Sequence, residues 1–261
     1  MELISSRNND KIKYAVKLRE LARFRRENGE FFAEGARLCS DAAKSGVTIR
    51  ALFVTEGALK KYGEYIKDIE NAAEEIYTVS DEVSEKLSDT KNGQGVFCIC
   101  KMLDKNTNIG KIKYNGKYIV LEEISNPQNF GAICRTAEAL GLDGVIVGGG
   151  CDIYNPKALR ASMGSLFRLN VFSCDTLKEL LCGLQKNGMN VYAAVPDRGA
   201  LAVTHADMTK GTAIVIGNEG DGISDEVKNA STSLITVPMK GRAESFNASA
   251  AASIVMWEMM R

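Results

Sequence analysis

At 261 residues the chain is long enough for one or two domains with a sizeable hydrophobic core. Hydrophobic residues make up 45% of it and charged residues 25%, which is typical of a globular protein. No apolar run approaches the ~20 residues that span a bilayer, so we expect no membrane partner. The formal net charge is zero, and the chain as a whole gives no signal for a polyanionic partner.

The numbers of cysteines and histidines indicate the redox compartment and whether a metal site is expected. The seven cysteines form no CxxC pair, and the first residues show no signal-peptide core. We therefore expect reduced thiols and a cytoplasmic location. Because His205 is the only histidine, we expect no metal site.

The first 26 residues are more basic than the rest of the chain. They hold eight Arg and Lys against three Asp and Glu, a net charge of +5. Two interpretations remain open at this point. The segment is either the solvated face of a helix or an arm that contacts phosphates.

The first hundred residues alternate predicted helices and strands. Apolar side chains near helical spacing predict a helix over residues 10–27. Ala36 begins a helix that Gly46 ends, and Ser80 is a favourable N-cap for another. The other expected elements are a helix at 60–73 and strands at 31–35, 49–55, 76–79 and 96–101. This order predicts a small α/β domain over residues 1–104.

The alternation restarts after a polar, Gly- and Asn-rich segment, residues 105–116, which we interpret as a linker. Expected strands lie at 118–124, 144–148, 171–174, 190–195, 213–217 and 234–237. Expected helices lie between them at 131–140, 156–167, 177–185 and 224–230, with a last one from 248. Residues 117–261 are therefore predicted to form an α/β domain with a mostly parallel sheet covered on both faces.

Three loops of this second domain carry polar residues that suit chemistry. The first is Ser125–Gly131, where Asn126 or Asn129 can cap the following helix. Arg135 follows one turn later, and an arginine in this position can hold a carboxylate or a phosphate. A surface ion pair with Glu138 or Glu122 is the alternative, and this stretch alone favours it.

The second loop, Gly217–Ser224, has three glycines within six residues and two acidic side chains, Glu219 and Asp221. The carboxylates would repel a phosphate, so the loop suits a neutral or cationic ligand. Ser224 is expected to cap a helix with an acidic first turn. An ordinary connection between a strand and a helix explains the same residues equally well.

The third loop, Val237–Asn247, leads into a run of six small residues, 248–253. Asn247 is a suitable N-cap for that helix. The small residues indicate close packing, against either a neighbouring backbone or a flat ligand. Beyond them, Ile254, Val255, Trp257 and Met260 are expected to be core or subunit contacts.

Three other site types are poorly supported. Gly148–Gly150 follows a strand, but Ile153 stands where a dinucleotide fingerprint needs glycine. No GxxxxGK[ST] phosphate loop occurs. A Ser–His–Asp triad would need His205, which lies in a polar segment without a partner pattern. A nucleotide-dependent oxidoreductase is therefore disfavoured.

Together the three loops resemble the three ordered motifs of the SpoU/TrmH family of RNA 2′-O-ribose methyltransferases, in the SPOUT superfamily. The matching stretches are NPQNFGAICRTAEALG, IVIGNEGDGIS and VPMKGRAESFNASAAASI, with RASMGSLFRLNV between the first two. The first hundred residues, with FFAEGARLCSDAAKSG and TKNGQGVFCIC, resemble the L30e-like substrate-binding domain that often precedes the methyltransferase domain. One departure is Phe246-Asn247-Ala248, where the family has Leu-Asn-Val.

The resemblance implies a trefoil knot, a homodimer and S-adenosylmethionine (AdoMet) as methyl donor. By position it implies catalytic roles for Arg135, Asn129, Glu219, Ser245 and Asn247, and AdoMet contacts at Ile216, Gly217, Val237, Phe246 and Asn247. Since arginine is a very weak base, we favour a positioning and charge-stabilising role for Arg135, in its own subunit or across a dimer.

We therefore expect an AdoMet-dependent enzyme that methylates a ribose 2′-OH of RNA. Ribosomal RNA is favoured over tRNA because the L30e-like module often accompanies rRNA enzymes. A tRNA methyltransferase and a non-catalytic RNA-binding protein of the same fold are the alternatives. With RNA as the expected substrate, the basic first segment gains weight as an RNA contact, through Lys13, Arg25 and Arg26.

Overall fold

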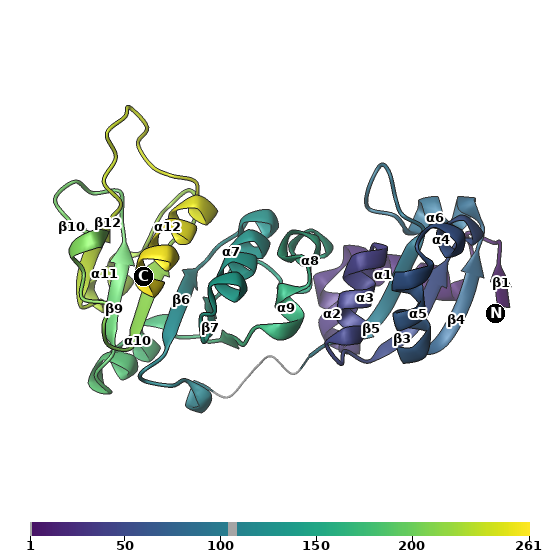
Figure 1. Cartoon of the computed structure of the whole chain (residues 1–261), viewed down its shortest axis with the longest axis horizontal. Helices are drawn as coiled ribbons and strands as arrows, with labels where there is room; N and C mark the ends of the chain where they lie inside the picture. The colour runs from purple at the N-terminus through teal and green to yellow at the C-terminus, as the bar shows by residue number, and fades with distance from the viewer. Residues whose placement is uncertain (1, 104–108) are drawn as a thin grey trace. The chain divides into compact units, whose positions relative to one another are not determined.

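A computed structural model describes residues 2–103 and 109–261. Internal contacts divide the chain into two compact units, Met1–Leu103 with Asp152–Phe167, and Asp104–Cys151 with Arg168–Arg261 (Figure 1). Residues 152–167 thus pack within the first unit although they lie, in sequence, inside the second expected domain. Of the expected linker, residues 105–108 lie outside the described residues, and a short 3₁₀ turn, η1, follows at Ile109–Lys111.

The first unit is built on a five-stranded mixed sheet in the order β1-β4-β3-β5-β2. Strand β4 pairs in parallel with β1 and β3, whereas β5 pairs antiparallel with β3 and β2. The strands are β1 (Glu2–Ile4), β2 (Glu30–Glu34), β3 (Ile49–Val54), β4 (Ala73–Val79) and β5 (Val96–Lys101). The helices are α1 (Asp10–Glu20), α2 (Ala22–Asn28), α3 (Ala36–Lys44), α4 (Glu56–Lys61), α5 (Gly63–Ala72), α6 (Asp81–Leu87), α8 (Pro156–Ser162) and α9 (Ser165–Arg168).

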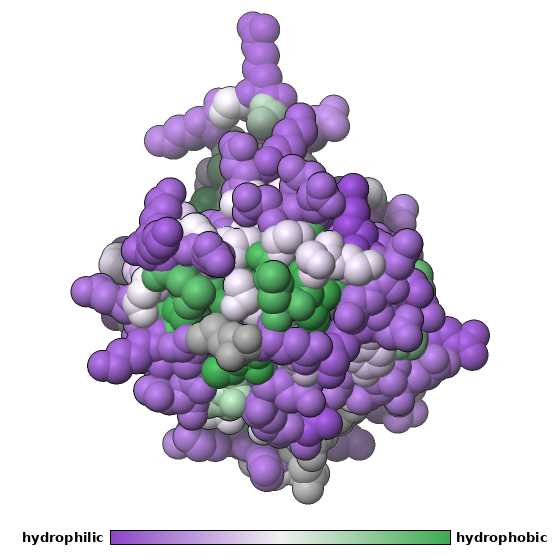
Figure 2. All heavy atoms as spheres, turned by 90° about the vertical axis from the view of Figure 1, so that its right-hand side faces the viewer, coloured by the Kyte–Doolittle hydropathy of each residue, from purple (hydrophilic) through white to green (hydrophobic). Residues whose placement is uncertain are grey.

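Aromatic packing joins the segment 152–167 to the rest of this unit. The Phe31 ring of β2 stacks on Tyr154 with 4.8 Å between ring centroids and on Phe167 with 6.0 Å. Phe31 is fully buried as a result. The face of the molecule seen in Figure 2 is mostly hydrophilic, with a few apolar areas near its centre.

Three predicted helices are each broken in two. The predicted helix 10–27 breaks at Leu21, whose backbone is extended (φ −112°, ψ 106°). The predicted helix 60–73 becomes α4 and α5 with a break at Tyr62. The predicted helix 156–167 is interrupted by Met163 and Gly164, both in the left-handed region (φ 49° and 81°). At the break at Leu21, Arg25 Nη1 donates to the Leu18 and Arg19 carbonyls at the end of α1, and the same side chain is paired with Asp152.

The second unit contains a seven-stranded sheet in the order β10-β12-β9-β11-β6-β7-β8, and all its pairings are parallel. This confirms the predicted parallel sheet. The strands are β6 (Lys117–Glu122), β7 (Gly144–Gly148), β8 (Val171–Ser173), β9 (Asn190–Ala194), β10 (Leu201–Ala202), β11 (Thr212–Ile216) and β12 (Ser233–Thr236). The helices are α7 (Pro127–Leu140), α10 (Leu177–Lys186), α11 (Asp225–Asn229) and α12 (Ala248–Met260), with a 3₁₀ turn, η2 (Val203–His205).

Helices cover the sheet of the second unit. Leu181 of α10 and Val227 of α11 pack with one set of alternate strand residues, which includes Val120 and Val215. Helices α7 and α12 pack against each other and contact β7 and β11, as Figure 1 also shows. The central strands are buried on both faces, which explains their nearly continuous apolar sequence.

Helix α7 begins earlier than the sequence predicts. It starts at Pro127, and Asn126 caps it by accepting a hydrogen bond from the Gln128 amide at 2.9 Å. Asn129 and Gly131 therefore lie in the first turns of a helix rather than in a loop. Among residues 2–103 and 109–261, no helix is long and apolar enough to cross a bilayer.

Candidate functional site

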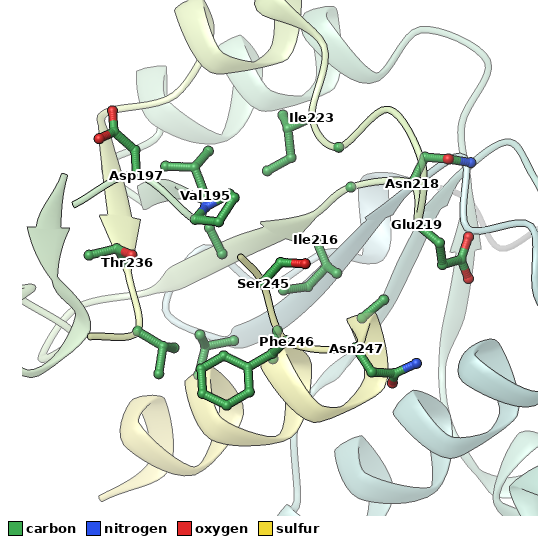
Figure 3. A pocket seen from close by; sticks show the side chains of 18 of the residues that line it. Val195, Asp197, Ile216, Asn218, Glu219, Ile223, Thr236, Ser245, Phe246 and Asn247 are labelled. Atoms are coloured by element: carbon green, nitrogen blue, oxygen red, sulfur yellow. The ribbon is translucent and has the colours of Figure 1, made fainter. Parts of the chain in front are cut away.

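A cavity of about 830 Å³ lies where three neighbouring parallel strands, β12, β9 and β11, end (Figure 3). Its walls come from the residues after these strands and from the first turns of α12. The lining includes Val195, Pro196, Asp197, Ile216, Gly217, Glu219, Ile223, Thr236, Val237, Met239, Ser245, Phe246, Asn247, Ala248 and Ala251. All five expected cofactor contacts are among them. The carboxyl ends of parallel strands are where α/β proteins bind ligands.

The glycine-rich loop after β11 has a defined fold of its own. Asn218 and Gly222 exchange two backbone hydrogen bonds of 3.0 Å, and Asn218 Oδ1 accepts from the Gly220 and Asp221 amides. A Cβ atom on Gly217 would lie 2.3 Å from the Gly222 backbone. Only glycine allows this approach, so the residue is required by the loop's own geometry.

Glu219, in the same loop, is the centre of a hydrogen-bond network that reaches the start of α7. Its Oε2 accepts from the Ser125 amide at 3.1 Å and the Ser125 hydroxyl at 2.9 Å. Its Oε1 accepts from the Asn126 amide at 3.2 Å and from Asn129 Nδ2 at 2.9 Å. Burial alone would raise the pKa of this carboxyl, but the hydrogen bonds from Asn129 and Ser125 outweigh it and lower the pKa to about 2. At neutral pH Glu219 is therefore ionised, and its carboxylate holds the start of α7 against the glycine-rich loop.

Asn129 extends this network to the third loop. Its Oδ1 accepts a hydrogen bond of 3.1 Å from Asn247 Nδ2, and its side chain is buried. Asn247 Oδ1 in turn accepts from the Ser249 and Ala250 amides, which confirms Asn247 as the N-cap of α12. The three predicted loops are thus joined by one chain of hydrogen bonds.

The run of small residues at the start of α12 allows both close helix packing and space for a ligand, the two alternatives that the sequence leaves open. Ala248 and Ala251 line the cavity. Ala252 is fully buried, and Ser253 Oγ lies 3.3 Å from Thr136 Oγ1 of α7. Small side chains therefore allow close helix packing on one side and leave room for a ligand on the other.

Ser245 and Phe246 also line the cavity, as Figure 3 shows. Phe246, which replaces the family's leucine, remains 40% exposed. An apolar ring left this exposed at a cavity wall is suited to cover a bound ligand.

Of the expected catalytic residues, Asn129 and Arg135 do not line the cavity. Asn129 is hydrogen-bonded to two residues that do, Glu219 and Asn247, whereas Arg135 is not. It lies on α7, is exposed, and makes no ion pair or side-chain hydrogen bond with any described residue. The surface ion pair that the sequence favours is absent from the described part of the chain. Glu138 instead binds Arg168 at 2.7 Å, and Glu122 accepts from the Ser224 hydroxyl at 2.6 Å.

The structure contradicts the expected RNA contact at Arg25. Its side chain is only 2% exposed and forms an ion pair with Asp152 at 2.6 Å. Together with its bonds to the Leu18 and Arg19 carbonyls, this makes Arg25 a structural residue of the first unit. Lys13 and Arg26 are exposed, and Lys13 pairs with Asp10 at 3.1 Å.

Sequence reasoning missed several residues that hold the site. Ser125 and Asn126 bind Glu219, and Asn218 Nδ2 donates to the Glu123 carbonyl at 2.7 Å. Val195, Pro196 and Asp197 form a wall after β9 that no motif marks. The one signal for that wall is its position after a predicted strand. No group of three or more potential metal ligands occurs among residues 2–103 and 109–261.

Comparison with known proteins identifies the family. The model of the SpoU rRNA Methylase family matches residues 116–257, and the model of the MRM3-like substrate binding domain matches residues 9–98. The 23S rRNA (guanosine(2553)-2′-O)-methyltransferase RlmP of Bacillus subtilis is 28% identical over 260 residues, which cover 99% of each chain. The 23S rRNA (uridine(2479)-2′-O)-methyltransferase of Streptomyces viridochromogenes is 28% identical over 89% of this chain and 83% of its own.

Solved structures agree with this assignment. The AdoMet-bound rRNA methyltransferase from Sinorhizobium meliloti superimposes with a TM-score of 0.86 at 26% identity, over 99% of this chain and 97% of that one. The match to the first family model covers more than half of the 261 residues. The chain therefore belongs to the SpoU rRNA Methylase family.

Proposed function

We propose that this protein is an AdoMet-dependent methyltransferase that acts on a ribose 2′-OH of ribosomal RNA. The observation that carries the proposal is the cavity at the ends of β9, β11 and β12, which brings the second and third motifs together and is joined by Asn129 to the first. Two of the relatives are named 23S rRNA 2′-O-methyltransferases, which favours rRNA over tRNA as the substrate.

The residues present fit AdoMet. A volume of about 830 Å³ is within the range of small-molecule and cofactor sites. The charged residues that line it are Asp197, Glu219, Asp221 and Lys228, so the lining is acidic overall and suits a cation. Ile216, Gly217, Val237, Phe246 and Asn247 would hold the cofactor. When bound, it supplies an electrophilic methyl group on a positively charged sulfur.

The chain's own contribution is rigidity and charge placement. Glu219 fixes Ser125, Asn126 and Asn129, and Asn129 fixes Asn247 at the start of α12. A site held in this way loses little energy to reorganisation during reaction. Ser245 presents a hydroxyl at the cavity wall, within reach of an acceptor group brought there.

Since arginine is a very weak base, we assign Arg135 to RNA positioning and charge stabilisation rather than proton removal. Because it does not line the cavity of its own chain, we propose that it acts across a homodimer. The exposed apolar side chains of α12 support such an interface: Ile254 is 36%, Met260 39% and Trp257 61% exposed. A trefoil knot in residues 117–261 and a cytoplasmic location complete the proposal.

We propose that residues 1–104 recognise the RNA, in agreement with the match to a substrate binding domain. Lys13 and Arg26 remain candidate contacts because both are exposed. Arg25 is not among them.

The test is a transfer assay with AdoMet labelled in its methyl group. Unmodified rRNA should be labelled, and nuclease digestion should release a 2′-O-methylated nucleotide. Calorimetry should show AdoMet binding by the protein alone. Binding of RNA without AdoMet uptake would instead support a non-catalytic RNA-binding protein, and labelling of tRNA but not rRNA would correct the substrate.

A further inference from the structure

The loop between β12 and α12, residues 237–247, carries two cations beside the cavity. Both of its ends belong to the cavity wall, through Val237 and Met239 on one side and through Ser245 and Phe246, labelled in Figure 3, on the other. The residues between them, 240–244, do not line the cavity and are exposed. Lys240 and Arg242 lie in this exposed part, together with one acidic residue, Glu244.

The cavity itself is unfavourable for a polyanion. Three carboxylates line it, Asp197, Glu219 and Asp221, and Figure 3 shows the first two on opposite sides. The one lining cation, Lys228, is bound to Asp225 at 3.0 Å. An RNA that presents a ribose here would meet repulsion unless nearby cations offset it.

Lys240 and Arg242 are free to provide that charge. Neither forms an ion pair or a side-chain hydrogen bond with any residue in the described ranges 2–103 and 109–261. Lys240 directly follows the lining residue Met239. Arg242 is three residues before Ser245, so their Cα atoms are at most about 11 Å apart.

We infer that Lys240 and Arg242 form a phosphate-contacting site that holds the RNA backbone next to the target ribose at the mouth of the cavity. This inference rests on the proposed function. Arginine can bind a phosphate bidentately, and lysine adds a mobile point charge. The carboxylate of AdoMet is a less suitable partner, because neither residue lines the cavity.

The backbone of this loop can adapt to a bound strand. No backbone hydrogen bond holds residues 238–246 to other parts of the described chain. The cations therefore sit on a segment whose two ends are fixed by the cavity wall and whose centre can follow the RNA. A phosphate site of this kind fixes the position of the strand and carries no sequence information.

The experiment compares the full-length wild type with the double variant Lys240→Ala/Arg242→Ala. RNA binding is measured by filter binding at several salt concentrations, with unmodified rRNA as the probe. AdoMet binding is measured by calorimetry, and kcat and KM for RNA by methyl transfer. The matched control is Lys186→Ala, because Lys186 is an exposed cation in the same unit, at the end of α10, without an ion pair among the described residues.

We expect the double variant to bind RNA on the order of tenfold more weakly. The slope of log K against log salt should fall by about 0.7–0.9 for each phosphate that the variant no longer neutralises. The KM for RNA should rise, while AdoMet affinity and kcat at saturating RNA stay within twofold. Lys186→Ala should match the wild type, and Lys240→Arg/Arg242→Lys should keep the salt slope.

An unchanged salt slope in a double variant that folds normally would overturn the inference. A loss of AdoMet affinity with unchanged RNA binding would assign the two cations to the cofactor instead. If the proposed function itself were wrong, the wild type would not transfer methyl groups to RNA. That result is distinguishable from both outcomes above.

Discussion

Asn129 Nδ2 donates a hydrogen bond of 2.9 Å to Glu219 Oε1, and this contact joins the first turn of α7 to the glycine-rich loop after β11. The oxygen of the same side chain, Asn129 Oδ1, accepts a hydrogen bond of 3.1 Å from Asn247 Nδ2. A side-chain amide can donate through its nitrogen to one neighbour and accept through its oxygen from the other, whereas a carboxylate can only accept. Asn129 therefore sets the relative positions of the three motifs.

Substitution of Asn129 by Asp should show this directly. The new carboxylate has the same shape but cannot donate to Glu219 and would repel it. Since small displacements of a positioned group cost about 100-fold in rate, we expect kcat/KM to fall by on the order of 100-fold. Gln128→Glu is the matched control, because it adds the same charge at the adjacent, exposed position. Equal activity of both variants would contradict the role given to Asn129.

The lowered pKa of Glu219 predicts a pH-dependent contribution to stability. The folded pKa of about 2 lies below the usual 4.5, so the ionised form is favoured by folding. Its contribution is fully present above pH 4.5 and is lost as the pH falls toward 2. Urea unfolding at pH 7 should therefore show wild type more stable than Glu219→Gln, with a smaller difference at about pH 3. A difference that is the same at both pH values would argue against the network.

Gly217→Ala should weaken AdoMet binding. The added methyl group would lie 2.3 Å from the Gly222 backbone and would force the loop apart. Gly220→Ala is the control, because a Cβ there would lie 3.5 Å from Asn218 Oδ1, an ordinary contact. We expect calorimetry to show a Kd about tenfold higher or more for Gly217→Ala alone, a loss of about 1.4 kcal/mol. Wild-type affinity in both variants would show that the loop geometry is not needed for the cofactor.

Arg135→Ala should abolish methyl transfer while AdoMet affinity and the unfolding temperature stay unchanged. The reason is that Arg135 is exposed and has no partner among the described residues, so nothing in the fold depends on it. Mixing Arg135→Ala with the strongly impaired Asn129→Asp variant tests whether Arg135 acts across a dimer. Partial recovery of activity in the mixture would indicate action across subunits. Full activity of Arg135→Ala alone would remove Arg135 from the mechanism.

Arg25 and Arg26 are neighbours with opposite predicted effects. Arg25→Ala leaves the Asp152 carboxylate without this ion pair in a mostly buried site, which costs about 3 kcal/mol of unfolding free energy. Arg26→Ala should leave stability within about 0.5 kcal/mol and weaken RNA binding modestly. Thermal unfolding and filter binding of the two variants check this. Reduced RNA binding by Arg25→Ala without loss of stability would reverse the assignment.

Features that depend on local sequence can be predicted, and those that depend on distant partners cannot. The helix caps at Ser80, Ser224 and Asn247 follow from the sequence because a cap bonds its own next turn. The parallel sheet follows from the order of apolar strands. Resemblance to the family then assigns the motif residues that line the cavity.

The break at Met163 and Gly164 involves a residue far away in sequence. A Cβ on Gly164 would lie 2.8 Å from the Asp41 side chain. The ion pair of Arg25 depends on Asp152, 127 residues away, and the low pKa of Glu219 depends on Ser125, 94 residues away. Neither the pattern of charges nor the spacing of motifs contains these contacts.

The most direct test of the central claim is a map of 2′-O-methyl groups in the rRNA of a strain that lacks this gene. We expect the loss of a 2′-O-methylated nucleotide, its return when the wild-type gene is restored, and no return with Arg135→Ala. A complete set of 2′-O-methyl groups in the rRNA of the deletion strain would contradict the account.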